Sequence, residues 1–186
     1  ATGLPYYKRF IRKYPNVIVL SQASEEDILK MWEGLGYYSR ARNLHKTSKI
    51  IVNEFDSIFP SNYETLIKLP GIGDYTANAI LAIAFNKPYI PLDGNVERII
   101  KRYLYLKKEN EIQKENLIEK KSILGFSNRS SDYAQALMEF GALVCKPTNP
   151  ICCQCPITKK CKSFKKKDFN LTKNSKKNKD KYFLLK

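Results

Sequence analysis

Residues 68–80, KLPGIGDYTANAI, constrain the fold more than any other part of this 186-residue chain. Pro70 ends the helical pattern before it, because a proline pushes the preceding residue out of the helical region. Gly71 and Gly73 permit a positive φ and, having no Cβ, allow another segment to approach closely. A second pattern with helical spacing follows at once: Ala77, Ile80, Leu81 and Ala84. The sequence therefore predicts two helices joined by a tight turn.

The turn also suggests a ligand. Backbone N–H groups in such a turn, beside the N-terminus of a helix, form a site for an anion. In this interpretation Leu69, Gly71 and Gly73 belong to a helix-hairpin-helix, which holds a DNA phosphate without reading the base sequence. An ordinary short connection is the alternative, and the G-x-G pattern alone favours it. The net charge of +15 favours a polyanionic partner and with it the DNA interpretation.

The rest of the chain body also shows helical spacing and no convincing strand, so the predicted class is all-α. Ser24, with Asp27 three residues on, is expected to cap a helix that Gly34 and Gly36 end, and Ser61 with Glu64 is expected to form a second capping box. Another helical face is formed by Leu137, Phe140, Gly141 and Val144. The apolar runs near Val17 and Ile50 are too short or badly placed to predict a sheet.

The cysteines form a second signal, because all five lie between Cys145 and Cys161. Four of them follow the pattern C-x6-C-x2-C-x5-C: Cys145, Cys152, Cys155 and Cys161. Thiolates at this density suit an iron–sulfur cluster, which needs several soft anionic ligands. A four-cysteine zinc site is the alternative, although zinc more often binds two C-x-x-C pairs. Disulfides fit the odd cysteine count poorly, and Cys153 is either an inert neighbour or a competing ligand.

Asp93, in IPLDGNVERIIKR, stands directly before a helical pattern. Aspartate is a favoured N-cap residue, so a structural cap is one interpretation. The other is a carboxylate placed to stabilise a cation that develops during a reaction. The residues alone leave both open.

The hairpin, the Asp93-Gly94-Asn95-Val96 segment and the four-cysteine loop, in this order, resemble the endonuclease III superfamily of DNA glycosylases. Residues 32–46, WEGLGYYSRARNLHK, resemble its MutY-type adenine DNA glycosylases. The resemblance runs from Ala1 to about Cys161. It implies a helix-hairpin-helix glycosylase fold whose four cysteines hold a [4Fe-4S] cluster, with zinc as the alternative. The implied organisation is a catalytic region over 1–164, a basic flexible linker over 165–181, and the first strand of a truncated second domain over 182–186.

The resemblance implies that adenine opposite 8-oxoguanine or guanine is flipped out of double-stranded DNA and its N-glycosidic bond is hydrolysed. Asp93 matches the family's catalytic aspartate, which stabilises an oxocarbenium-like sugar, and Asn95 is expected to orient the site beside it. Tyr75 stands where lyase relatives carry a Schiff-base lysine. A phenol cannot form that Schiff base, so base removal without efficient strand cleavage is expected.

The resemblance also implies DNA contacts outside the hairpin. Tyr37 matches the aromatic wedge that enters the duplex beside the oxidised guanine, and Leu35 and Gly36 belong to the same segment. Arg40 and Arg42 are expected to meet phosphates. The expected assembly is a monomer on DNA with no membrane association, in a bacterial cytoplasm beside the nucleoid; a nucleus is the alternative.

Departures from the family pattern qualify these expectations. The family's catalytic glutamate lies ahead of the position that matches Ala1, so the chain is expected to be a fragment that excises little or nothing by itself. Asp74 stands where relatives often carry a basic residue, which should weaken the hold on phosphate. The alternative functions are a lyase-type glycosylase for oxidised pyrimidines and a non-catalytic DNA-binding module with a structural four-cysteine metal site.

Overall fold

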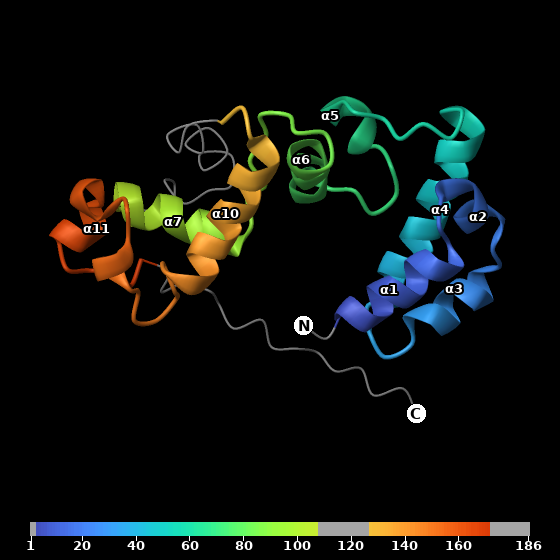
Figure 1. The fold of residues 1–186 in the computed structure, drawn as a ribbon. Helices are drawn as coiled ribbons and strands as arrows, with labels where there is room; N and C mark the ends of the chain where they lie inside the picture. The colour runs from blue at the N-terminus through green and yellow to red at the C-terminus, as the bar shows by residue number, and fades with distance from the viewer. Residues whose placement is uncertain (1–2, 108–126, 172–186) are drawn as a thin grey trace. The chain divides into compact units, whose positions relative to one another are not determined.

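The computed structural model describes residues 3–107 and 127–171, and the regular secondary structure in these ranges is entirely helical (Figure 1). The predicted all-α class is confirmed. The chain divides into two compact units, Ala1–Pro91 and Leu92–Lys186. The strand expected over 182–186 and the linker beyond residue 171 lie outside the described residues. No helix in the described ranges is long and apolar enough to cross a membrane.

The first unit contains six helices within residues 3–91: α1 (Gly3–Lys13), α2 (Val17–Gln22), α3 (Glu25–Trp32), α4 (Tyr38–Glu54), α5 (Tyr63–Leu66) and α6 (Asp74–Ile83). Both α2 and α3 pack on α4, the longest of these helices. The apolar run at Val17 forms α2, and Ile50 lies within α4, so neither run is a strand.

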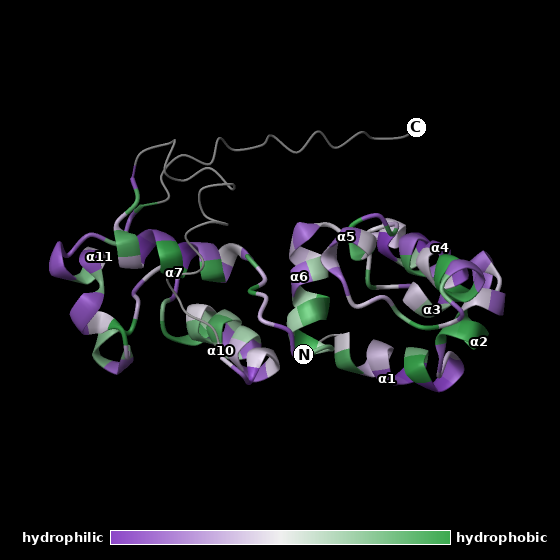
Figure 2. Ribbon diagram, turned by 90° about the horizontal axis from the view of Figure 1, so that it is seen from above, coloured by the Kyte–Doolittle hydropathy of each residue, from purple (hydrophilic) through white to green (hydrophobic). Residues whose placement is uncertain are grey.

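Two apolar clusters hold this unit together. One cluster joins α4, α5 and α6 through Ile51, Leu66, Leu69, Ala77 and Leu81. The other joins α2, α3 and α4 to Tyr14, directly after α1, through Leu20, Ile28 and Ala41, and Phe10 of α1 packs against it. Figure 2 shows hydrophobic colours along much of α6. Each fully buried aliphatic side chain of this kind contributes about 1.5–3 kcal/mol, and the first of these clusters packs beneath the hairpin between α5 and α6.

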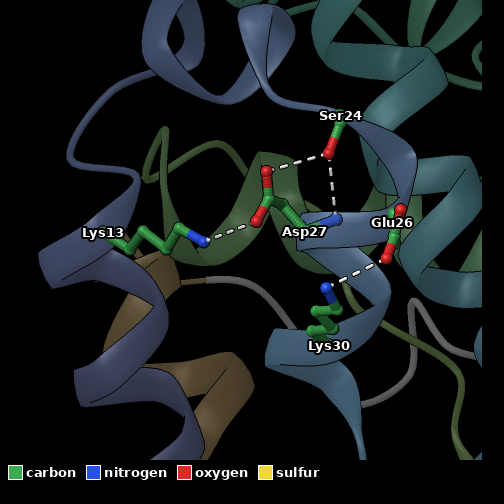
Figure 3. A network of polar contacts seen from close by, with 5 residues as sticks. All are labelled: Lys13, Ser24, Glu26, Asp27 and Lys30. Atoms are coloured by element: carbon green, nitrogen blue, oxygen red, sulfur yellow. Dashed lines mark hydrogen bonds and ion pairs between the residues drawn. The ribbon is translucent and has the colours of Figure 1, made fainter.

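Ser24 caps α3 as predicted. Its hydroxyl accepts a hydrogen bond from the Asp27 backbone N–H at 3.1 Å and donates to the Asp27 carboxylate at 2.8 Å (Figure 3). The same carboxylate pairs with Lys13 of α1 at 3.2 Å. The Ser24 and Lys13 hydrogen bonds lower the pKa of Asp27, and they tie α1 to the start of α3.

The second predicted capping box is wrong. Asn62, not Ser61, caps α5, because its side-chain oxygen accepts a hydrogen bond from the Thr65 backbone N–H at 2.9 Å. Ser61 instead accepts hydrogen bonds from the Lys87 ammonium through its carbonyl and its hydroxyl oxygens. Serine and asparagine are both favoured N-cap residues, so the sequence alone did not decide whether Ser61 or Asn62 caps the helix.

The second unit is built around α7 (Gly94–Leu104), which packs against α10 (Ser130–Leu143) and α11 (Lys162–Lys165). Val96, Ile99 and Ile100 form the buried face of α7. Two short 3-10 turns, η2 (Cys152–Gln154) and η3 (Thr158–Lys160), shape the cysteine loop between α10 and α11.

The packed body of this unit extends past residue 164, where the flexible linker was expected to begin. The Tyr105 hydroxyl donates a hydrogen bond to the Asp168 carboxylate at 2.9 Å, and the Leu171 side chain is buried. Residues 165–171 are therefore structured, and the rest of the range in which the linker was expected lies outside the described residues.

Candidate functional site

The segment between α5 and α6 forms the predicted tight turn. The Ile72 backbone N–H donates to the Leu69 carbonyl at 3.1 Å, which closes a four-residue turn with Pro70 second and Gly71 third. Gly71 has a φ of +78°. A positive φ at the third position, after a proline at the second, is the signature of a type II turn. The Leu69 side chain is buried, so only its backbone can serve the DNA contact expected of it.

The outer side of this turn presents unused hydrogen-bond donors. The backbone N–H groups of Gly71 and Gly73 donate to no residue in the described parts of the chain, and both glycines are exposed. Gly73 is the N-cap of α6 and supplies no side-chain cap. Free N–H groups beside the positive end of a helix favour an anion.

Asp74, the first residue of α6, adds negative charge beside this site. Its carboxylate accepts hydrogen bonds from the Tyr63 hydroxyl at 2.8 Å and from the Asn78 amide at 3.0 Å. The hydrogen bond to Asp74 raises the pKa of Tyr63, which keeps the phenol protonated as a donor. The carboxylate is thus held by neighbouring side chains, and its charge still opposes a phosphate nearby.

Replacing Gly71 by valine is expected to weaken binding to every duplex by a similar factor, roughly tenfold, through loss of charge-assisted hydrogen bonds. A Cβ at Gly71 would meet the Asn43 Cβ at 2.7 Å, and the φ of +78° disfavours any β-branched residue. Titrations with mispaired and fully paired duplexes measure the effect, with circular dichroism confirming the fold. Unchanged affinity for both duplexes would count against the hairpin as a phosphate site.

The expected wedge residue, Tyr37, is one of the most exposed aromatic side chains described, at 79 %. It lies in the left-handed region, with φ +50°, directly before α4. The Trp32 indole N–H donates to the Gly36 carbonyl at 3.1 Å and anchors the segment that contains Leu35. The Arg40 guanidinium lies 5.2 Å from the Tyr37 ring centre. This segment therefore holds an aromatic ring and a cation together at the surface.

Arg42 differs from Arg40, because its guanidinium pairs with the Glu25 carboxylate at 2.9 Å. Both partners are about half exposed, so the pair is weak and open to exchange with a phosphate. Tyr75 lies in the first turn of α6, with 42 % of its surface exposed.

Asp93 caps α7, which confirms the structural interpretation. One carboxylate oxygen, Oδ1, accepts hydrogen bonds from the backbone N–H groups of Asn95 at 2.9 Å and Val96 at 2.7 Å. The other oxygen, Oδ2, accepts from the Asn95 side-chain amide at 3.0 Å. The carboxylate is half-buried and fixed by three donors. A cap held in this way is also a preorganised negative charge, so the second interpretation stays compatible with the geometry.

Asn95 is in turn held by a residue that the sequence did not single out. The Arg98 guanidinium donates to the Asn95 side-chain oxygen at 2.7 Å, to the Gly141 carbonyl at 2.7 Å and to the Cys145 carbonyl at 2.8 Å. Burial lowers the pKa of Arg98 from its ordinary value. Hydrogen bonds thus run from Asp93 through Asn95 and Arg98 to the start of the cysteine loop.

Gly141 permits this arrangement. A Cβ at Gly141 would lie 2.6 Å from the Asn95 Cβ and 3.1 Å from its Cα. Only a glycine therefore allows α10 to approach the first turn of α7 so closely.

Arg102, one helical turn after Arg98, was also missed. Its guanidinium donates to the carbonyls of Lys146 at 2.6 Å, Pro147 at 2.7 Å and Phe169 at 3.2 Å. Only 4 % of the residue is exposed. Arginines on an amphipathic helix are ordinarily read as solvated, and the i, i+4 spacing was the only signal that they share a face.

The four predicted ligand cysteines line one cavity, whereas the exposed Cys153 does not. The cavity wall includes Ile99, Phe140 and Phe164. Burial, and then the neighbouring cysteines, raise the pKa of Cys152.

Within the described residues, no three His, Cys, Asp or Glu side chains are grouped closely enough to hold one metal ion. Cys145, Cys152, Cys155 and Cys161, which line one cavity, are the residues that would hold a cluster or a zinc ion there.

Comparison with known proteins decides the family. Residues 1–124 match the family model described as HhH-GPD superfamily base excision DNA repair protein. The chain belongs to this family. Its fold agrees with that of a thermostable thymine-DNA glycosylase, with a TM-score of 0.78 and 29 % identity over 87 % of this chain and 76 % of that one. An endonuclease III–DNA complex gives a TM-score of 0.72 at 26 % identity, over 88 % of this chain and 76 % of that one.

Curated members of similar sequence are named adenine DNA glycosylases. The protein of Buchnera aphidicola subsp. Baizongia pistaciae is 42 % identical over 163 residues, which cover 88 % of this chain and 46 % of that protein. The Homo sapiens protein is 38 % identical over 170 residues, which cover 88 % of this chain and 30 % of that protein. The chain thus spans about half the length, or less, of these relatives.

Proposed function

We propose that this chain is the glycosylase part of an adenine DNA glycosylase, which hydrolyses the N-glycosidic bond of adenine opposite 8-oxoguanine or guanine in duplex DNA. The observation that carries the proposal is the similarity, over 88 % of the chain, to adenine DNA glycosylases of both bacterial and mammalian origin. The fold it shares with endonuclease III supports the coarser function of a DNA glycosylase.

In the proposed reaction, Asp93 stabilises the positive charge that develops on the sugar. The bond from C1′ to the adenine nitrogen breaks, adenine leaves with the electron pair, and water then adds to C1′ and loses a proton. A carboxylate already held by three donors needs no reorganisation to meet that charge. Asn95 keeps the carboxylate oriented from its side-chain amide, as a positioning residue.

Adenine becomes a good leaving group only when its ring accepts a proton. The family resemblance assigns this proton to a glutamate ahead of the position that matches Ala1. We therefore propose that the described residues stabilise the cation and hold the DNA, while that glutamate supplies the acid. Excision is best measured on the protein expressed from its complete reading frame.

Tyr75 argues for hydrolysis alone and against the lyase alternative. A lyase needs an amine that attacks C1′ and forms a Schiff base with the opened sugar. The side chain at this position is a phenol, which forms no such intermediate. The proposed product is a duplex with an intact backbone and one missing base.

The proposed DNA contacts come from two places in the first unit. Gly71 and Gly73 hold a phosphate by their N–H groups, and Tyr37 enters the duplex beside the oxidised guanine, with Leu35 and Gly36 next to it. Arg40 and Arg42 pair with phosphates. We propose that the protein acts on DNA as a monomer, because the hairpin and the Tyr37 segment belong to the same chain. We propose a bacterial cytoplasm as its location, because bacterial proteins are among the similar relatives.

We further propose that Cys145, Cys152, Cys155 and Cys161 hold a [4Fe-4S] cluster. When bound, such a cluster ties four points of the loop together. The loop is already joined to α7 by Arg98 and Arg102, so its order supports the helix that carries Asp93 and Asn95.

Protein purified without oxygen is expected to be brown and to contain roughly four irons per chain. Replacing Cys155 by serine should lower the iron content severely, whereas replacing Cys153 by serine should leave it unchanged. Cys155 is one of the four cysteines that line the cavity, and Cys153 is not. Iron and zinc analysis of the three proteins measures this. Colourless protein with one zinc per chain would refute the cluster.

The proposed substrate is tested by single-turnover excision on a panel of duplexes. Adenine opposite 8-oxoguanine and adenine opposite guanine should be processed, while thymine opposite guanine and an oxidised pyrimidine should not. Preferred excision of thymine would favour the activity named for the structural neighbour. Binding without excision of any base would favour the DNA-binding module.

A further inference from the structure

Helix α4 lies behind the hairpin and contacts its backbone directly. The Thr47 hydroxyl donates a hydrogen bond to the Pro70 carbonyl at 3.0 Å, across 23 residues of sequence. Only 5 % of Thr47 is exposed. One turn earlier on α4, the Asn43 side chain fills the space where a Cβ at Gly71 would lie. The turn is therefore held on its inner side by a helix that is not part of the hairpin motif.

The hydrogen bond from Thr47 fixes the direction of one peptide group. All described peptide bonds are trans, so the Pro70 carbonyl and the Gly71 N–H point in opposite directions from one plane. A carbonyl drawn onto Thr47 directs the Gly71 N–H away from α4. Type I and type II turns differ mainly by a flip of this central peptide, so the hydroxyl stabilises the type II form that Pro70 and Gly71 already favour.

We propose that Thr47 is a positioning residue for DNA binding, whose hydroxyl holds the Pro70–Gly71 peptide so that the Gly71 N–H faces the phosphate. This inference rests on the proposed role of the hairpin. The Ile72 N–H is already used by the Leu69 carbonyl, which leaves Gly71 and Gly73 as the turn's unused donors in the described residues. A change in the direction of Gly71 therefore removes a large share of the hold on phosphate.

The test compares three variants of the 186-residue chain. Thr47→Val removes the hydroxyl but keeps the branched shape, and Thr47→Ser keeps the hydroxyl. Ser48→Ala is the matched control, because Ser48 is equally buried but its hydroxyl donates at 2.7 Å to the His45 carbonyl inside α4. Duplex affinity is measured over a series of salt concentrations, beside the melting temperature of each variant.

Thr47→Val should bind both mispaired and matched duplexes roughly threefold to tenfold more weakly. The slope of affinity against salt should stay unchanged, because no cationic side chain is lost. Thr47→Ser should restore affinity to within about twofold, and Ser48→Ala should bind as the unaltered chain does even if it melts earlier. The Gly71 amide resonance, which should shift when the duplex binds, should shift less in Thr47→Val.

Equal weakening by Thr47→Val and Ser48→Ala would overturn the inference, because general loss of stability would then explain both. Failure of Thr47→Ser to restore affinity would also overturn it. No duplex binding by the unaltered chain is a separate outcome, which would refute the proposed role of the hairpin itself.

Discussion

Replacing Asp93 by asparagine will lower the single-turnover rate of adenine excision by roughly 10²- to 10³-fold or more, the range for losing one preorganised electrostatic group. The amide keeps the shape of the side chain and still accepts the N–H groups of Asn95 and Val96, but it carries no charge to stabilise the sugar cation. The measurement uses protein from the complete reading frame and a duplex with adenine opposite 8-oxoguanine. Binding of that duplex should change little.

The same substitution separates the two roles of Asp93. Asparagine is as good an N-cap as aspartate, so Asp93→Asn should melt close to the unaltered protein. Asp93→Ala loses both roles and should lose about 1 kcal/mol of stability as well. Excision by Asp93→Asn at an undiminished rate would leave Asp93 with the structural role alone.

Replacing Gly141 by alanine should destabilise the second unit by about 2–3 kcal/mol, a large effect for one methyl group. The added Cβ would meet Asn95 at 2.6 Å, and two of the atoms within reach belong to the Asn95 backbone. Neither can move without shifting α7. Because Arg98 bonds both Gly141 and Asn95, the shift should also disturb the carboxylate of Asp93.

Gly94→Ala is the matched control, since a Cβ at Gly94 would meet nothing within 4 Å and this residue begins the same helix. It should be neutral or slightly stabilising. Circular dichroism follows both units, while fluorescence of Trp32, the chain's one tryptophan, follows the first unit. Gly141→Ala should lower the melting temperature followed by circular dichroism and leave the transition followed by Trp32 fluorescence nearly unchanged. Similar melting of the two glycine variants would refute the close approach of α10 and α7.

Features determined by neighbours in the sequence could be predicted. Pro70 and Gly71 impose their turn through their own backbone chemistry, and Ser24 caps α3 through a residue three positions on. Asp93 was correctly placed before a helix for the same reason. The cysteine spacing grouped Cys145, Cys152, Cys155 and Cys161 as one set of ligands and left the role of Cys153 open; these four cysteines line one cavity, and the exposed Cys153 does not.

Features that depend on distant partners could not be predicted. Arg98 and Arg102 bind carbonyls more than 40 residues away, and nothing in their own helix distinguishes them from solvated arginines. Gly141 looked like one apolar position of a helix face, whereas its lack of a Cβ is what the packing uses. Thr47 contacts the hairpin only because the fold returns α5 and α6 to α4.

The central claim is best tested by one single-turnover assay whose samples are divided, half of each treated with hot alkali. The protein comes from the complete reading frame, and the duplex carries one adenine opposite 8-oxoguanine. Strand breaks at that adenine are expected only in the alkali-treated half, because the base is removed and Tyr75 cannot cleave the backbone. Breaks of equal yield without alkali would contradict it, as would the absence of breaks in both halves from protein that binds the duplex.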